Sequence, residues 1–426
     1  MNERKRALEA FSDIVHRGSY ANLRLNRDPG AGENDRFTRA LIYTALEKLL
    51  RIDRILSVYA GKKTDERVKD ILRLGICELL YMDTPAHAVV NGYVSLAKES
   101  GRSRQAGFVN AVLRRADRER DALPPLPDDE WEALSVEYGY PLWIVGKWRR
   151  EYGDETTRAL IQAEPLPMSI RAQYPLSKDR LKALLPCECT EGTLDTECLK
   201  LSAGIGVEGF APFLEGSCAV QGEGAMLACR ALGDCRGLNV LDACAAPGGK
   251  SAYIASLSEN TAHITAWELH AHRTELMKKN FARLHTDITA ETHDASAFDE
   301  RFAHHFDRVL LDVPCSGLGL LAGKPDLRYG KDERDIEALV SVQQNILDCC
   351  CRYVKPGGIL VYSTCTVSRD ENDLQVAAFL KRHPDFVPDG LPFADGHTIQ
   401  LLPHIHGTEG FFIARMRYVP DGTHTI

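Results

Sequence analysis

Apolar residues in the first 121 positions recur at spacings of three and four, the repeat that lines one face of an α-helix. Gly and Pro residues interrupt the repeat, as they do where helices end. The pattern predicts five helices, over residues 4–15, 35–60, 68–81, 88–99 and 105–115. Asp35 is a candidate N-cap for the second of them.

From about residue 238 the pattern changes to short apolar runs separated by helical stretches. The runs predict strands over residues 238–242, 263–267, 308–312 and 359–363. A further run from Gly410 to Arg415 follows a Gly-rich turn and predicts a last strand. Strands that alternate with helices are typical of a parallel sheet with helices on both faces.

The region between these two patterns is mixed, with helical stretches and short strand-like runs near 168–173 and 219–221. A Pro-rich stretch at 124–128 predicts a linker. A chain of 426 residues is also longer than one domain usually is. We therefore expect a multi-domain protein, with an all-α domain at 1–123, a small mixed α/β domain at 129–235 and an α/β domain at 236–420.

Composition places the chain among globular proteins, with 44% hydrophobic and 26% charged residues. No apolar run approaches the roughly 20 residues that span a bilayer, and no signal-peptide pattern opens the chain. We expect a cytoplasmic protein with no membrane partner. The net charge is −8, but residues 1–121 hold 23 Lys and Arg against 17 Asp and Glu. The basic N-terminal part permits contact with phosphates.

Cysteine usage excludes the common structural sites. The 13 cysteines are an odd number and include no CxxC pair, so neither a disulfide framework nor a zinc site is expected. Cys349, Cys350 and Cys351 are adjacent and would point in different directions on a helix. We therefore expect no metal.

The first motif with chemical content is the loop that follows the strand at 238–242, with the sequence Asp-Ala-Cys-Ala-Ala-Pro-Gly-Gly-Lys over 242–250. Small residues let a ligand approach the backbone, and the N-terminus of the following helix favours a carboxylate or phosphate. A P-loop would need a glycine at Cys244, so that interpretation fails. A plain strand-to-helix turn remains the alternative for this loop alone.

Acidic residues follow the next two strands. Glu268 ends the strand at 263–267, and Asp294 follows a third strand. In nucleoside-binding α/β folds an acid about 20 residues after the glycine loop holds the ribose hydroxyls. Asp294 could then receive an adenine amino group. Each acid alone is more commonly a solvated surface residue, but in series with the loop they predict a nucleoside pocket.

Two later motifs each place a cysteine just past the carboxyl end of a strand. They are Asp-Val-Pro-Cys-Ser-Gly at 312–317 and Ser-Thr-Cys-Thr at 363–366. A free cysteine is usually a small buried residue. Ligand sites of open α/β sheets lie at the edge where these strands end, so Cys315 and Cys365 together are candidates for catalysis.

Cytosine methylation is a reaction that needs such thiols. Carbon 5 of cytosine is a poor nucleophile, and a thiolate that adds to carbon 6 makes it able to take a methyl group from a sulfonium. An acid at ring nitrogen 3 eases the addition, and a protonated Asp312 is a candidate. A base must then remove the carbon 5 proton. The target base must be unpaired or flipped out of its stack.

These motifs resemble those of the bacterial 16S ribosomal RNA cytosine-C5 methyltransferases, which carry a fused N-terminal domain of the antitermination-factor type. In the C-terminal half the similar segments are 242–250, 312–317, 363–366 and 407–412. In the N-terminal half the segments 71–81, 85–91 and 108–115 look like the family's helical RNA-binding module.

The resemblance implies a Rossmann-like S-adenosylmethionine-dependent methyltransferase domain, preceded by a connecting subdomain that contacts RNA. It implies that the cofactor is held by Cys244, Ala245, Ala246, Pro247, Gly248, Gly249, Lys250, Glu268, Asp294 and Asp312. It also implies that Cys365 attacks carbon 6 beside Asp312 and that Cys315 assists release. The implied substrate is RNA, above all 16S ribosomal RNA, and the implied state is a monomer.

Three positions depart from the family pattern. Glu268 stands where Asp is common, Gly222-Glu223 follows Gln221 where a single Asp is usual, and Ala322-Gly323-Lys324 replaces Arg-x-His. The first adds a methylene but keeps the carboxylate chemistry. The second concerns the cofactor's methionine end, and the third concerns an arginine contact to RNA, with Lys324 keeping a positive charge there.

Two other functions compete with this one. A non-enzymatic RNA-binding factor could keep the same scaffold, and binding of S-adenosylmethionine would distinguish the two. A methyltransferase for exocyclic amines typically uses Asn/Asp-Pro-Pro-aromatic, whereas this chain has Asp-Val-Pro-Cys at 312–315.

Overall fold

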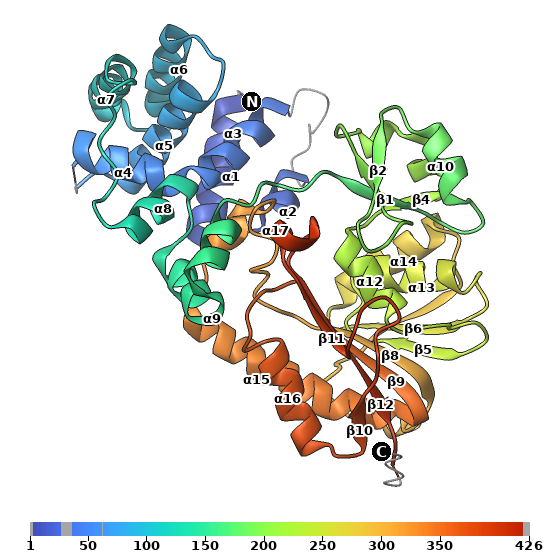
Figure 1. Ribbon diagram of the computed structural model, residues 1–426. Helices are drawn as coiled ribbons and strands as arrows, with labels where there is room; N and C mark the ends of the chain where they lie inside the picture. The colour runs from blue at the N-terminus through green and yellow to red at the C-terminus, as the bar shows by residue number, and fades with distance from the viewer. Residues whose placement is uncertain (1–2, 27–35, 62, 421–426) are drawn as a thin grey trace. The chain divides into compact units, whose positions relative to one another are not determined.

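The structure is a computed structural model that describes residues 3–26, 36–61 and 63–420 (Figure 1). The predicted N-cap Asp35 lies outside these residues. The chain forms two compact units, which we call unit 1 and unit 2. Unit 1 holds residues 1–162 and 323–332, and unit 2 holds residues 163–322 and 333–426.

Unit 1 is helical, as the first part of the sequence predicts. Its main helices are α1 (Glu3–Arg17), α2 (Ala21–Asn26), α3 (Arg36–Glu47), α4 (Leu49–Tyr59), α5 (Glu66–Tyr81), α6 (Ala86–Glu99), α7 (Ala106–Arg118), α8 (Glu130–Tyr138) and α9 (Leu142–Ile161). One long helix was predicted over 35–60, but the structure has two, separated at Lys48. The break lets the apolar stripes of α3 and α4 both enter the same buried core.

Residues 323–332 leave unit 2 and pack into unit 1. Arg328 is 3% exposed, and its guanidinium donates a hydrogen bond to the Tyr138 carbonyl at 2.8 Å. The Tyr329 hydroxyl donates to the Leu46 carbonyl at 3.1 Å, and the Ala21 amide donates to Asp326 Oδ2 at 3.1 Å. The local sequence pattern does not predict that residues 323–332 belong to unit 1.

Unit 2 is built on an eight-stranded sheet. Its strands are β5 (Asn239–Asp242), β6 (His263–Glu268), β7 (Ile288–Thr292), β8 (Phe306–Asp312), β9 (Val354–Thr364), β10 (Phe386–Pro388), β11 (Thr398–Leu401) and β12 (Phe411–Tyr418). The order is β10-β12-β9-β8-β5-β6-β7, and β11 pairs with β12. The strands from β9 to β7 are parallel, as predicted, whereas β12 runs antiparallel to β9.

Helices cover both faces of this sheet because its central strands are apolar on both sides. Leu310 and Val361 pack with α12 (Glu223–Arg230), α13 (Gly249–Leu257) and α14 (Ala271–Arg283). Leu311 and Tyr362, the neighbours of these residues in the chain, pack with α15 (Glu333–Cys350) and α16 (Asp373–Arg382) on the opposite face. The predicted α/β arrangement is therefore confirmed.

A smaller antiparallel sheet precedes the large one in the chain. It has the order β2-β3-β1-β4, with β1 (Ser169–Ala172), β2 (Cys189–Glu191), β3 (Leu199–Leu201) and β4 (Cys218–Val220). Helix α10 (Lys178–Leu184) packs against β1, and Leu181 joins the small core of this sheet. The strand-like runs predicted near 168–173 and 219–221 correspond to β1 and β4.

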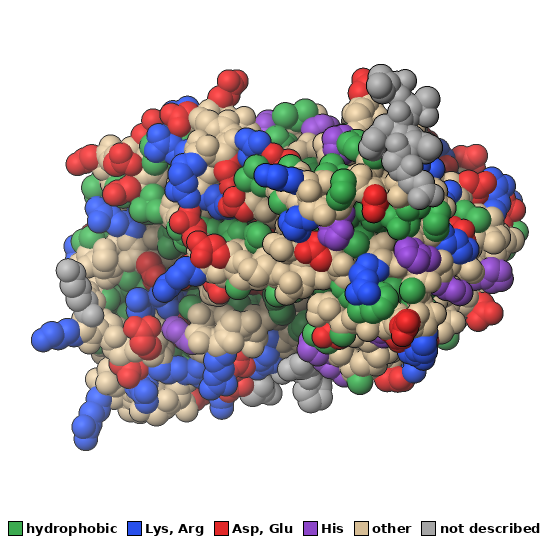
Figure 2. Space-filling model, turned by 90° about the horizontal axis from the view of Figure 1, so that it is seen from below, with side chains coloured by type: hydrophobic (Ala, Val, Ile, Leu, Met, Phe, Trp, Pro, Cys, Tyr) green, Lys and Arg blue, Asp and Glu red, His purple; other side chains and the backbone are tan. Residues whose placement is uncertain are grey.

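Charge on the surface is mixed. Figure 2 shows Lys and Arg side chains interspersed with Asp and Glu over the face in view. In unit 1 several basic side chains pair with acids, for example Arg102 with Asp65 and Arg120 with Asp117. Across the described residues, no helix has the length and apolar character needed to cross a membrane.

Candidate active site

The predicted site residues of unit 2 gather at one edge of the large sheet. Asp242, Glu268 and Asp312 are the last residues of β5, β6 and β8, and Cys365 directly follows β9. Because these strands are parallel neighbours, their carboxyl ends meet at the same edge. Asp294 follows β7 two residues after its end, at the same edge.

The structure brings the two motif cysteines together. Cys315 Sγ lies 3.2 Å from Cys365 Sγ, although the residues are 50 positions apart in the chain. The pairing of β8 with β9, which sets Asp312 opposite Ser363, produces this approach. Both side chains are half-buried free thiols, so each remains accessible to a ligand at the sheet edge.

The two thiols differ in what they can do. The hydrogen bond with Cys365, together with burial, raises the pKa of Cys315 well above its usual value. Cys315 therefore keeps its proton at neutral pH. A neutral thiol beside Cys365 can donate a hydrogen bond to the Cys365 sulfur, and such a bond favours the thiolate form of its acceptor.

An ion pair lies next to the cysteine loops. Lys250 Nζ donates to Asp312 Oδ2 at 2.6 Å, and Ser363 Oγ donates to Asp312 Oδ1 at 2.9 Å. Burial opposes the charge of Lys250, but the Asp312 carboxylate outweighs it and raises the pKa of Lys250. The loop at 244–250 and the Pro-Cys motif are thus joined by a half-buried cation that can also donate a hydrogen bond to a ligand.

Glu371, which the sequence motifs do not include, holds the two cysteine loops to each other. Its side chain is fully buried and accepts hydrogen bonds from the Ser316 amide at 2.8 Å and the Ser316 hydroxyl at 2.6 Å. It also accepts from Gln343 Nε2 at 3.1 Å and the Thr366 hydroxyl at 3.3 Å. Because Ser316 is 55 positions from Glu371 in the chain, only the fold reveals this link between the two loops.

The closing motif at 407–412 packs against the same loops. The Gly319 amide donates to the Cys365 carbonyl at 3.1 Å, and the Gly410 amide donates to the Gly319 carbonyl at 3.0 Å. A Cβ on Gly319 would overlap the carbonyl oxygen of Gly410. The glycines are therefore required by the close approach of the two backbones.

The loop at 244–250 has the shape of a ligand cradle. The Ala245 amide donates to the Trp267 carbonyl at 2.9 Å, which ties the loop to β6. Gly248 has a φ of 95°, and a Cβ there would lie 2.6 Å from the Phe281 ring. Gly249 opens α13, and a Cβ there would meet nothing within 4 Å. A ligand can therefore approach the N-terminus of α13 at Gly249.

Two buried polar atoms near this cradle lack hydrogen-bond partners within the described part of the chain. They are Asp242 Oδ1 and Gln221 Nε2. Asp242 leads directly into the loop, and its other oxygen accepts from Ser251 Oγ at 2.7 Å. One free acceptor and one free donor fit a ligand that carries both, as the amino-acid part of S-adenosylmethionine does.

The two acids assigned to the nucleoside end have different surroundings. Glu268 is 5% exposed and pairs with Arg273 at 3.1 Å. Asp294 is exposed, and its carboxylate accepts from the hydroxyl and the amide of Ser296, which lower its pKa. The carbonyl of Glu268 accepts from the His293 amide at 3.0 Å, so the two acids lie on adjoining segments.

The departure at 222–223 has a structural explanation. Where the family has Asp, a Cβ on Gly222 would overlap the carboxylate of Glu409, which fills that space. Glu223 turns toward the small-sheet region, where it pairs with Lys200 at 2.7 Å and accepts from the Asp195 amide at 2.8 Å. Glu223 therefore does not replace the missing Asp, and Glu409 brings a carboxylate to its place.

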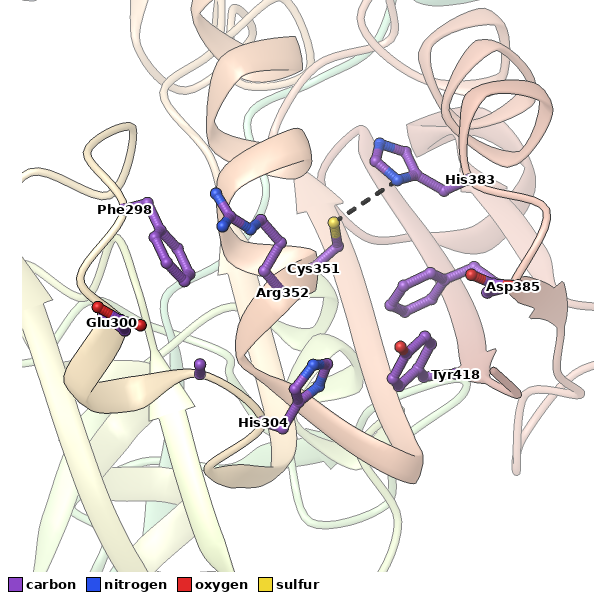
Figure 3. A pocket seen from close by; sticks show the side chains of 10 residues that line it. Phe298, Glu300, His304, Cys351, Arg352, His383, Asp385 and Tyr418 are labelled. Atoms are coloured by element: carbon purple, nitrogen blue, oxygen red, sulfur yellow. Dashed lines mark hydrogen bonds between the residues drawn. The ribbon is translucent and has the colours of Figure 1, made fainter. Parts of the chain in front are cut away.

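A second pocket lies at the opposite edge of the sheet (Figure 3). It has a volume of about 410 Å³, and its lining includes His304 before β8, Arg352 before β9 and Tyr418 at the end of β12. None of the predicted site residues lines it. Across the described residues no cluster of three His, Cys, Asp or Glu side chains could hold a metal ion.

Two families of known proteins match the chain. The family described as 16S rRNA methyltransferase RsmB/F matches residues 231–417, and the NusB family matches residues 1–118. The probable ribosomal RNA small subunit methyltransferase B of Bacillus subtilis is 36% identical, over 96% of this chain and 97% of that protein. The ribosomal RNA small subunit methyltransferase B of Shewanella oneidensis is 31% identical, over 98% of this chain and 99% of that protein.

The crystal structure of PH0851 superimposes with a TM-score of 0.83 at 25% identity, over 98% of this chain and 99% of that one. The sheet, the cradle at its edge and these relatives together define the class, an S-adenosylmethionine-dependent RNA methyltransferase. Within that class the chain belongs to the ribosomal RNA small subunit methyltransferase B family. The resemblance, the fold class and the enzyme class given by the sequence are thereby confirmed.

Proposed function

We propose that this protein methylates carbon 5 of a cytosine in 16S ribosomal RNA through a covalent bond between Cys365 and carbon 6. The observation that supports it most is the pair of sulfurs 3.2 Å apart beside the Lys250–Asp312 ion pair. The relatives named for the small ribosomal subunit support the choice of RNA.

The cofactor would be held by the loop residues Cys244, Ala245, Ala246, Pro247, Gly248, Gly249 and Lys250 and by the acids Glu268, Asp294 and Asp312. Bound there, S-adenosylmethionine supplies an electrophilic methyl group. The open space at Gly249 and the unpaired atoms of Asp242 and Gln221 support this location. Because Lys250 occupies one oxygen of Asp312, that carboxylate orients the lysine as well as the ligand.

In the first half of the reaction the Cys365 thiolate forms a bond with carbon 6. The electrons of the 5,6 double bond then pass to carbon 5, which becomes nucleophilic. Cys315 keeps its proton and donates it in a hydrogen bond to the attacking sulfur. A donor at ring nitrogen 3 is also required, and the Lys250 ammonium and a protonated Asp312 are the candidates.

Carbon 5 would then take the methyl group that S-adenosylmethionine supplies, and S-adenosylhomocysteine would be left. In the second half a base removes the proton of carbon 5. The electrons of that C–H bond restore the 5,6 double bond, and the bond between Cys365 and carbon 6 breaks. Cys315 is the titratable group in contact with the departing sulfur, so we assign to it the assistance of release.

The other parts of the chain would bind the RNA and connect its binding domain to the catalytic domain. We propose an RNA-binding domain at 1–123, a connecting subdomain at 129–235 and the catalytic domain at 236–420. The NusB match and the basic N-terminal part support the first of these. A cytoplasmic monomer is the simplest form consistent with a ribosomal RNA substrate.

Replacement of Cys365 tests the central step. We expect Cys365→Ala to abolish transfer of tritiated methyl groups to unmodified small-subunit RNA, because the variant lacks the sulfur proposed to bond to carbon 6. Cys315→Ala should accumulate a covalent RNA adduct that migrates slowly on denaturing gels. Cys351→Ala is the matched control, since Cys351 lines the pocket at the other edge of the sheet. Undiminished methylation by Cys365→Ala would refute the proposal.

A further inference from the structure

Arg171 is a fully buried charge whose hydrogen-bond partners are all neutral groups. It lies in β1 of the small sheet with 0% exposure. Its guanidinium donates to Gln221 Oε1 and Gln173 Oε1, both at 2.6 Å, and to the carbonyls of Ala172 at 3.1 Å and Gly249 at 3.3 Å. Among the residues that the structure describes, no carboxylate pairs with it.

Such an arrangement is unfavourable by itself. A buried charge is normally paired, because transfer from water to a weakly polar interior is opposed by several kcal/mol per ion. Burial lowers the pKa of Arg171 to about 10, so the side chain is still positive at neutral pH. The Tyr253 ring, 4.6 Å away, offsets part of the penalty but supplies no anion.

The Arg171 guanidinium contacts the loop at 244–250 of the large-sheet region. Gly249, whose carbonyl it contacts, is the first residue of α13. The residues that follow Arg171 in the chain contact α13 further along the helix. Gln173 Nε2 donates to the Ala252 carbonyl, and the Tyr174 amide donates to Ser256 Oγ. The small sheet is thus fastened along the first two turns of α13, with its one buried cation at the N-terminal end.

We propose that Arg171 is a positioning residue for the cofactor, holding the Gly249 turn and supplying the positive charge that favours the methionine carboxylate. The inference rests on the proposed function, in which this turn holds S-adenosylmethionine. The helix N-terminus attracts an anion weakly. A guanidinium in the dry layer behind it adds a full charge that is screened little by solvent. The anion that the buried charge lacks is then the ligand.

The test compares two thioethers that differ only at the amino-acid end. S-adenosylhomocysteine carries the carboxylate and the amino group, and 5′-methylthioadenosine carries neither. Calorimetric titration of the full chain should show that Arg171→Met weakens the binding of S-adenosylhomocysteine about tenfold, as expected for loss of a charge close to an anion. The binding of 5′-methylthioadenosine should weaken less than about twofold. Arg171→Lys keeps the positive charge but loses the planar set of donors of a guanidinium. It should weaken the binding of S-adenosylhomocysteine only about threefold.

Arg230→Met is the matched control. Arg230 lies over the same Tyr253 ring, at 6.0 Å, and pairs with Asp195, away from the turn. It should leave both dissociation constants unchanged. Equal weakening of the two ligands by Arg171→Met, or no weakening of either, would overturn the inference. If Arg171→Met does not fold, the change in the two dissociation constants caused by Arg171→Lys is compared in the same way. Failure of the wild-type chain to bind S-adenosylhomocysteine would instead refute the proposed function.

Discussion

At the scale of single residues, burial just before the loop at 244–250 changes the acidity of Asp242. The residue is fully buried at the end of β5, and burial raises the pKa of its carboxyl to about 6 despite the hydrogen bond from Ser251. The protonated form is therefore favoured in the folded chain relative to the unfolded one. Its contribution to stability is complete below pH 3.8, the ordinary value, and is lost as the pH rises through 6.

We therefore expect the free energy of unfolding to fall between pH 4 and pH 6 in the wild type relative to Asp242→Asn, by at most roughly 3 kcal/mol. Urea unfolding across this range measures the difference. Asp294→Asn is the control of opposite sign, since hydrogen bonds from Ser296 lower the pKa of Asp294. A wild type and an Asp242→Asn variant with parallel profiles would contradict the expectation.

The sequence indicated candidate site residues where the chemistry requires particular residue types. The cysteines, Asp312 and the glycines of the loop stand out because few residue types can replace them. Glu371 and Gln343 did not stand out, since their partners in the site other than Thr366 lie 28 to 55 positions away. Hydrogen bonds over such separations leave no local pattern.

At the scale of elements, the proposed reaction depends on the two cysteine loops, which must keep their spacing. Glu371 bridges them through Ser316 and Thr366. We expect Glu371→Gln to lower kcat by about tenfold to a hundredfold, because small displacements of reacting groups are costly. The dissociation constant of S-adenosylhomocysteine should not change, because the hydrogen bonds of Glu371 in the described part of the chain go to Ser316, Gln343, Tyr362 and Thr366 and not to the 244–250 loop.

Single-turnover methylation and calorimetry measure the two quantities for Glu371→Gln. Asp373→Asn is its control, because Asp373 lies two residues further along and pairs at the surface with Arg369. If the kcat of Glu371→Gln matched that of Asp373→Asn, the bridge would have no part in catalysis.

The sequence predicted most elements but not all of their relations. Alternating apolar runs predict strands and their burial, and the strands from β5 to β9 were found where expected. The antiparallel direction of β12 was not predicted, because a hydrophobic run has no direction. The break at Lys48 was missed as well, since no Gly or Pro marks it.

At the scale of the whole molecule, residues 323–332 make the chain return to unit 1 from within the sequence of unit 2. We expect Arg328→Met to destabilise unit 1 by about 2 kcal/mol, because the carbonyls of Tyr138 and Gly139 lose a buried charged donor. Hydrogen exchange should become faster in α8 and in 323–332. Binding of S-adenosylhomocysteine should be unchanged, since every proposed cofactor residue belongs to unit 2.

Lys324→Met is the control for this variant, since Lys324 is an exposed residue of the same segment. It should leave hydrogen exchange unaltered. Exchange that is equally slow in Arg328→Met and in the wild type would show that the segment is held by its other contacts, through Asp326 and Tyr329.

The sequence by itself determined the fold class and the family, and it predicted the loop at 244–250 and the two cysteines as site residues, because apolar periodicity and obligatory residue types are local properties of a chain. Only the tertiary structure decided that the two sulfurs lie 3.2 Å apart, that Lys250 pairs with Asp312 and that Arg171 is buried without a counter-anion. These facts depend on strand register and packing between distant segments, and no local pattern encodes either one.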